Sequence, residues 1–83
     1  MKDWKQRIEI NPQVMLGKPV IAGTRIPVEK ILRKMAADVS VEAVLRDYPR
    51  LTREDVQAAL AYASDVVGFW WARRERLLHN VPR

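Results

Sequence analysis

The sequence predicts a mainly helical protein, in which short N-terminal strands or a hairpin precede a three-helix bundle and a C-terminal helical extension. Two observations predict it. Residues 17–28 alternate β-branched residues with glycines and prolines, which suits short extended segments joined by a tight turn. From Val28 onward, apolar residues recur with the i, i+3, i+4 spacing of an amphipathic helix. The change of period at Val28 therefore divides a small extended part from a helical remainder.

The first predicted strand covers residues 7–10, where polar and apolar side chains alternate until Asn11-Pro12 ends the pattern. Residues 17–28 are expected to supply one or two further short strands. Pro19 and Pro27 lack an N–H group, so they belong at strand ends or edges. A sheet this small is weak alone and must pack on helices or pair with another chain.

Three helices follow. The first begins at Val28 and ends before residues 38–40, and Ser40 is suited to cap the second helix, which Pro49 stops. Residues 52–55 resemble a capping box that opens the third helix, with Asp in place of the usual Glu or Gln. The predicted apolar stripes are Val28, Ile31, Leu32, Met35 and Ala36; Val41, Val44, Leu45 and Tyr48; and Val56, Ala59, Leu60, Ala63 and Val67.

Length and charge bound the class of protein. A chain of 83 residues is at most one domain, and its net charge of +5 favours an anionic partner such as nucleic acid or an acidic protein site. A solvated basic surface remains an equal alternative. The charge is uneven: residues 1–65 carry a net +2 and residues 66–83 a net +3. The chain has no cysteine, no apolar run long enough to span a bilayer and no signal-peptide core, so we expect a cytoplasmic location and no membrane association.

The second and third helices are spaced as in a helix-turn-helix, with Leu51 as the apolar residue between them. Arg50 and Arg53 flank the start of the candidate recognition helix, where side chains can meet phosphates. Gln57 lies one turn further and can read adenine. The alternative is that the three helices serve only as a core or a protein-docking module.

Two further features bear on this interface. Ala58 and Ala61 are expected on the outer face of the third helix, where small side chains allow close approach to a groove. Glu54 and Asp55 place negative charge at the helix start, which favours the helix dipole but repels phosphate.

Residues 66–71 are apolar around every side of a helix, so they must be covered. Cations and two leucines follow them, and aromatic residues with arginine dominate protein interfaces. The sequence therefore predicts a partner-binding tail. Folding back onto the chain's own core and lying on a membrane surface remain alternatives.

No constellation of residues supports catalysis. The single histidine, His79, lies in the tail, and Ser40 and Ser64 have no histidine base beside them in the predicted arrangement. Residues 17–23 lack the Gly-Lys-Ser/Thr ending of a phosphate-binding loop. We expect no enzymatic activity, no catalytic residue, no metal site and no cofactor.

Asn11-Pro12 and residues 17–28 closely resemble the signature of the domain-of-unknown-function family 433 (DUF433), and residues 48–52 with the following helix resemble its second block. The resemblance covers about residues 7–67 and implies a small bacterial or archaeal protein with a homeodomain-like helix-turn-helix. Members look like VapB-type antitoxins that pair with PIN-like ribonuclease toxins. The resemblance thus implies a homodimer that binds operator DNA and a C-terminal extension that wraps the toxin.

The combined prediction divides the chain into a DNA-binding and dimerisation domain, residues 1–67, and a partner-binding tail, residues 68–83. Its DNA-binding residues are Lys18, Arg25, Arg50, Thr52, Arg53 and Gln57. Its toxin-binding residues are Phe69, Trp70, Trp71, Arg73, Arg74, Arg76, Leu77 and Leu78, of which one arginine is expected to reach the acidic centre of the nuclease. The alternative function is a protein-interaction or dimerisation module without DNA binding.

Overall fold

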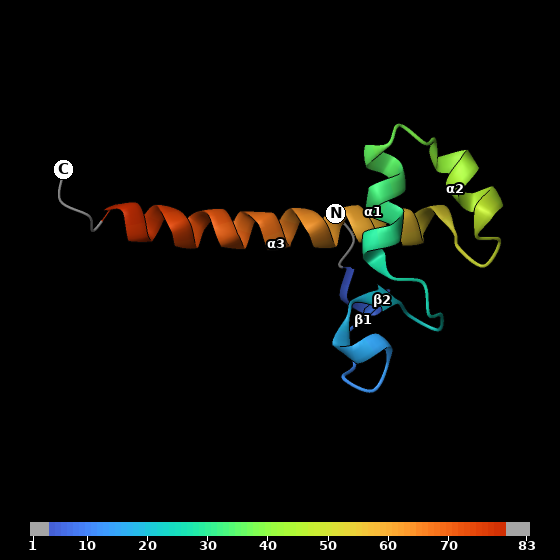
Figure 1. Cartoon of the computed structure of the whole chain (residues 1–83), viewed down its shortest axis with the longest axis horizontal. Helices are drawn as coiled ribbons and strands as arrows, with labels where there is room; N and C mark the ends of the chain where they lie inside the picture. The colour runs from blue at the N-terminus through green and yellow to red at the C-terminus, as the bar shows by residue number, and fades with distance from the viewer. Residues whose placement is uncertain (1–3, 80–83) are drawn as a thin grey trace.

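The computed structural model describes residues 4–79, and within its last helix the side chains at positions 70, 71 and 74–79 lie outside that description. A short hairpin precedes three helices, which confirms the mainly helical prediction (Figure 1). The elements in chain order are the 3-10 turn η1 (Trp4–Gln6), β1 (Ile8–Glu9), the 3-10 turn η2 (Met15–Gly17), β2 (Val20–Ile21), α1 (Val28–Ala36), α2 (Val41–Asp47) and α3 (Arg53–His79).

The hairpin pairs β1 and β2 antiparallel, with Ile8 opposite Ile21. Beyond β2 the chain turns back at once, and the amide of Ile21 donates to the carbonyl oxygen of Ile26 at 3.0 Å. Gly23 sits in this turn with a φ of +77°, a conformation that favours glycine. Residues 17–28 therefore form one strand and a tight loop that leads into α1, with Pro27 immediately before the helix.

Side chains cap two helices as predicted. The hydroxyl of Ser40 accepts a 3.1 Å hydrogen bond from the amide of Ala43 at the start of α2. At the start of α3, the amide of Thr52 donates to the Asp55 carboxylate at 3.0 Å, and the amide of Asp55 donates to the Thr52 hydroxyl at 3.2 Å. This reciprocal pair is a capping box, so Asp replaces Glu or Gln there without loss of the motif.

One apolar core joins the hairpin to the helices. Val20 and Ile21 from β2 are fully buried, as are side chains from each helix: Val28 and Ile31, Val44, and Val56. Leu51, in the turn between α2 and α3, is 5% exposed and belongs to the same core. The hairpin is therefore part of the globular unit, as a two-stranded sheet must be to persist.

The predicted faces of α3 need a correction. Ala58 and Ala61 are buried, at 6% and 8% exposed, whereas Leu60 is 42% exposed. The reason is that η1 and β1 pack against α3. Arg7 bonds to Asp55 and the Trp4 ring contacts Tyr62, and Ala58 lies between these two contacts on the same helix face. The small alanine side chains thus allow the N-terminal segment to pack closely on α3, and they are not exposed to a DNA groove.

The contacts between the N-terminal segment and α3 end near Asp65. Its carboxylate accepts a 2.6 Å hydrogen bond from the indole N–H of Trp4. Beyond it, Val66, Val67 and Phe69 are 47%, 63% and 71% exposed. At 27 residues, α3 is about 40 Å long, and its second half projects from the rest of the protein (Figure 1). The boundary at residues 67/68 therefore falls inside one continuous helix.

Candidate functional site

The turn between α2 and α3 gathers three of the predicted DNA-binding residues. Arg50, Thr52 and Arg53 are all exposed there. The turn is tight because the amide of Leu51 donates to the carbonyl oxygen of Tyr48 at 2.9 Å, and the Leu51 side chain fills the space beneath. This one tight turn therefore presents three polar side chains at the start of α3.

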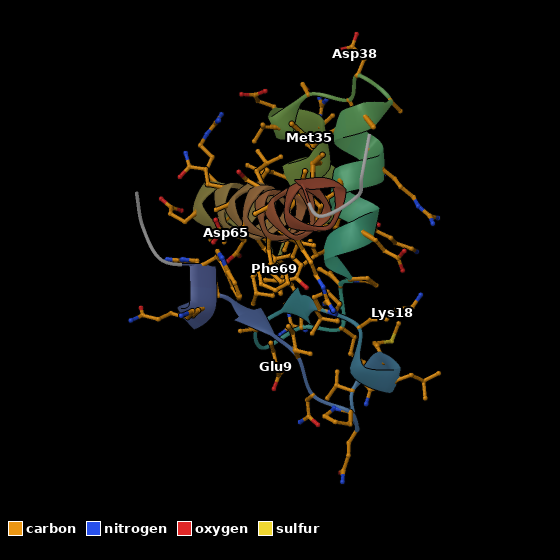
Figure 2. All side chains as sticks on the ribbon, turned by 90° about the vertical axis from the view of Figure 1, so that its left-hand side faces the viewer. Glu9, Lys18, Met35, Asp38, Asp65 and Phe69 are labelled. Carbon is orange, nitrogen blue, oxygen red and sulfur yellow. The ribbon has the colours of Figure 1, made fainter. Side chains whose placement is uncertain are left out.

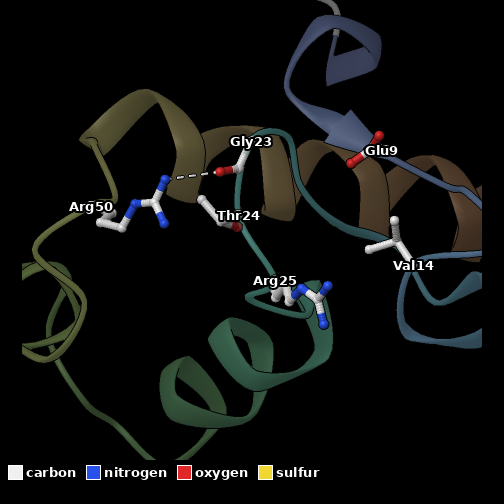
Figure 3. Close-up of a pocket in the computed structure, with 6 residues that line it drawn as sticks. All are labelled: Glu9, Val14, Gly23, Thr24, Arg25 and Arg50. Carbon is white, nitrogen blue, oxygen red and sulfur yellow. Dashed lines mark hydrogen bonds between the residues drawn. The ribbon is translucent and has the colours of Figure 1, made fainter.

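Arg50 is anchored on the loop that follows β2. Its Nη2 atom donates a 3.0 Å hydrogen bond to the carbonyl oxygen of Gly23 (Figure 3). An open pocket of about 430 Å³ lies at this junction, and its lining includes Arg25 and Arg50 as well as Glu9. The structure thus brings together two of the predicted DNA-binding arginines that are far apart in sequence, with one carboxylate beside them.

Arg53 is paired with Glu42 of α2. The hydrogen bond from Arg53 is the main reason that the pKa of Glu42 lies below its ordinary value. The Thr52 hydroxyl accepts a hydrogen bond from the amide of Asp55, so it has a capping role in addition to any contact with a ligand. Gln57 is exposed one turn after Arg53 and shares its side of α3.

Lys18 lies apart from this group. Its ammonium group is 2.7 Å from the carboxylate of Glu29 on α1, and the two residues line a smaller recess with Pro19. The hydrogen bond from Lys18 is the main cause that lowers the pKa of Glu29 below its ordinary value, with a smaller contribution from Arg33. The structure therefore does not bring Lys18 to the pocket that Arg25 and Arg50 line.

Asp55 has a role that the sequence analysis missed. It is 8% exposed, and the Arg7 guanidinium lies 3.1 Å from its carboxylate. Its charge is therefore compensated inside the protein and is not displayed toward a phosphate, contrary to the expectation at the start of α3. Arg7 occupies a polar position just before β1, and nothing in its local sequence marks the pairing.

The projecting half of α3 supplies the second candidate surface. Phe69 and Arg73, both predicted to bind a partner, are exposed. Phe69 projects from α3 on the same side as the hairpin in a view along the helix (Figure 2). The exposed Val66 and Val67 extend this surface and were not among the predicted residues. None of the three apolar side chains folds back onto the core. The other predicted tail residues lie among the side chains that the structure does not describe: Trp70, Trp71, Arg74, Arg76, Leu77 and Leu78.

Between residues 4 and 79, no helix is long and apolar enough to cross a membrane. Among the side chains that the structure describes, no group of three or more His, Cys, Asp or Glu residues is arranged to hold a metal ion.

The fold and the surface together define a class: a small helical domain in which an N-terminal hairpin is packed on three helices and tied to the α2–α3 turn by an arginine. Residues 8–63 match the model of the family described as "Protein of unknown function (DUF433)". This match covers more than half of the chain, so the protein belongs to the DUF433 family, and the resemblance seen in the sequence is confirmed.

Two relatives support this assignment. The chain is 36% identical over 59 residues to the uncharacterized protein y4eO of Sinorhizobium fredii (strain NBRC 101917 / NGR234), covering 71% of this chain and 27% of that protein. It also resembles the crystal structure of a DUF433 member protein from Anabaena variabilis ATCC 29413, with 36% identity and a TM-score of 0.68 over 71% of this chain and 58% of that one. The chain thus spans only about a quarter of the first relative and less than two thirds of the second.

Proposed function

We propose that the protein is the antitoxin of a toxin–antitoxin pair, and that it binds operator DNA as a homodimer and holds a PIN-like ribonuclease through the C-terminal half of α3. The observation that carries the proposal is the division of α3 into two unlike halves. The first half packs against the N-terminal segment and begins next to exposed arginines. The second half leaves Val66, Val67 and Phe69 exposed. A DNA-reading unit joined to a partner-binding helix accounts for both halves.

For the DNA-binding part, we interpret α2, the following turn and α3 as a homeodomain-like helix-turn-helix. Arg50 uses one N–H group on Gly23, and a guanidinium has five, so it retains donors for a phosphate. Arg53 and Gln57 point to the same side of α3. Arg25 would extend the contact from the adjacent loop.

Operator binding measured against salt concentration tests this part. The double substitution Arg50→Ala and Arg53→Ala should weaken binding and flatten the slope of log K against log salt by about two units if both side chains contact phosphate. Lys30→Ala with Arg33→Ala removes the same charge from α1 and serves as the matched control. Absence of binding to the protein's own promoter at low salt would contradict the DNA-binding proposal.

For the partner-binding part, exposed apolar side chains beside Arg73 suit a protein with an apolar groove and an acidic rim. Phe69→Asp should abolish co-purification with a PIN-like ribonuclease encoded beside this gene, because it puts a charge where an apolar anchor is needed. The matched control is Leu60→Asp, which changes an exposed leucine of the braced half. Equal loss in both variants would argue against a tail-specific site.

Reversal of the charges of Arg73, Arg74 and Arg76 tests whether an arginine reaches the nuclease centre. Inhibition of the nuclease that survives this change would exclude that contact.

The second candidate function is a protein-interaction module without DNA binding. One specific observation favours it: Arg50 and Arg53, the principal DNA-binding candidates, are engaged by Gly23 and Glu42 within the chain. In that case the same operator assay shows no shift, while the interaction through Phe69 persists.

A further inference from the structure

The pocket between the hairpin, the loop that follows β2 and the α2–α3 turn holds charges that the protein leaves unpaired. Its volume of about 430 Å³ lies in the range of pockets that bind small molecules. Arg25 and Glu9 both line it, yet neither side chain has a hydrogen-bond or ion-pair partner among the described residues. The two opposite charges also do not pair with each other, so both are available to a third molecule.

A second cation, Arg50, lines the same pocket from the α2–α3 turn (Figure 3). Its bond to the Gly23 carbonyl oxygen uses one of five N–H groups and fixes the guanidinium against the loop after β2. The loop is itself held, because the Thr24 hydroxyl donates to the carbonyl oxygen of Ile21 at 2.7 Å. Arg25 is exposed and has no partner in the described chain, so its side chain can turn toward Arg50. The pocket thus offers one positioned and one adjustable guanidinium.

The charges of the pocket select its ligand. Two guanidinium groups balance a phosphate monoester, which carries about −1.5 to −2 charges at neutral pH, better than they balance a carboxylate. Their N–H forks also fit its oxygen atoms. Glu9, half-buried at the end of β1, accepts hydrogen bonds when ionised and repels a second anionic group. The rest of the ligand is therefore uncharged and carries donors such as hydroxyl groups. Val14 lines the pocket on the side of Glu9 and gives this part an apolar contact (Figure 3).

We propose that this pocket binds the phosphate monoester of a sugar. Arg25 and Arg50 hold the phosphate, a sugar hydroxyl donates to the carboxylate of Glu9, and Val14 contacts the carbon atoms of the sugar ring. The volume of the pocket leaves room for a sugar beside the phosphate. A free sugar phosphate and a mononucleotide share this chemistry and differ in the base.

This inference goes beyond the proposed function and does not depend on it. The two meet at Arg25 and Arg50, which are also candidates for contact with operator DNA, so a sugar phosphate and the operator compete for these side chains. The tests of the pocket contain neither DNA nor toxin. Their failure leaves the operator and co-purification tests unaffected, and absence of operator binding leaves the ligand of the pocket unaffected.

Titration of the full chain, followed by NMR of its backbone amides, tests the binding. Ribose 5-phosphate should bind at least about tenfold more tightly than inorganic phosphate, because it adds a hydrogen bond to a carboxylate. Ribose without the phosphate should not bind. Adenosine monophosphate separates the two sources: binding tighter than that of ribose 5-phosphate identifies a mononucleotide, and equal or weaker binding identifies a sugar phosphate. Equal affinities for ribose 5-phosphate and inorganic phosphate, or no binding of either, would overturn the proposal.

The phosphate contact is tested by Arg25→Ala, which should weaken the binding of ribose 5-phosphate at least about tenfold. Arg46→Ala removes the same charge from α2, outside the pocket, and should change the affinity less than about twofold. The side chain of Arg25 has no partner in the described chain, so the variant should unfold at the same temperature as the natural protein. Equal losses of affinity in the two variants would show that net charge, and not the pocket, binds the phosphate.

The hydroxyl contact is tested by Glu9→Met, which removes the carboxylate and keeps the length of the side chain. Ribose 5-phosphate and inorganic phosphate carry nearly the same charge, so the loss of repulsion strengthens the binding of both alike. The ratio of their affinities therefore isolates the hydrogen bond to Glu9, and it should fall toward one in the variant. A ratio that stays as large as in the natural protein would overturn the assignment of the sugar to Glu9.

Discussion

The guanidinium of Arg50 donates a 3.0 Å hydrogen bond to the carbonyl oxygen of Gly23, 27 positions earlier in the chain. This bond joins the two segments through which the family is recognised, the extended stretch at residues 17–28 and the turn at residues 48–52. It links the α2–α3 turn to the loop that follows β2, where Arg25 and Arg50 line one pocket (Figure 3).

Loss of this bond should be measurable as lost stability. Arg50→Ala is expected to lower the free energy of unfolding by about 1 kcal/mol, the net contribution of one intramolecular hydrogen bond. Arg46→Ala, an exposed arginine at the end of α2, should change it by less than about 0.5 kcal/mol. Urea unfolding followed by circular dichroism measures both. Equal effects of the two substitutions would show that the bond to Gly23 contributes nothing.

Substitutions around Asp55 should follow a definite order of severity. Asp55→Ala removes the capping bond to the Thr52 amide and leaves Arg7 without its partner, so we expect a loss of about 2–3 kcal/mol. Thr52→Ala removes one cap and should cost about 1 kcal/mol. Arg7→Met should cost less than about 1 kcal/mol, because the Arg7 side chain is 41% exposed. The same urea titrations rank them, and an Arg7→Met loss as large as that of Asp55→Ala would assign the stability to the ion pair and not to the cap.

Local patterns in the sequence predict most of the fold. Ser40 and the Thr52–Asp55 pair are short-range capping signals, and the structure confirms both. Which face of α3 is buried could not be predicted in the same way. Leu60 is more apolar than Ala61, yet Ala61 is the buried one, because the N-terminal segment packs closely against the small residues of that face. That choice depends on a contact between distant parts of the chain, which helical periodicity does not contain.

The candidate site shows the same limit. The sequence places cations near the start of α3, but the partners of those cations lie elsewhere: Glu42 on the preceding helix for Arg53, and Gly23 in the first motif for Arg50. Pairing across the fold decides which charges remain available to a ligand. The exposure of Leu16 was also not predicted, since its left-handed conformation follows from the closed turn around it.

The ion pair of Lys18 and Glu29 should appear in the titration of the carboxylate. Because the folded-state pKa of Glu29 is lowered, the pair stabilises the protein above the ordinary glutamate value of 4.5, and this stabilisation is lost as the pH falls through the folded-state value. Lys18→Met should raise the pKa of Glu29 toward 4.5, as followed by NMR of the side-chain carboxyl carbons. Glu42, whose pKa is lowered mainly by Arg53, is the internal control. A shift of Glu42 as large as that of Glu29 would mean a general effect of net charge.

Two glycine-to-alanine substitutions should have opposite effects on stability, although neither creates a steric collision. An added Cβ would meet no atom within 4 Å at Gly68 or at Gly23, so backbone conformation alone decides the outcome. Gly68 lies inside α3, where glycine is about 0.5–1 kcal/mol less favourable than alanine, and Gly68→Ala should therefore raise helix content and slow amide hydrogen exchange beyond Asp65. Gly23 has a φ of +77°, so Gly23→Ala should destabilise the protein by about 1 kcal/mol in urea unfolding. If Gly68→Ala changed neither the helix content nor the hydrogen exchange, the second half of α3 would not be helical in the free protein.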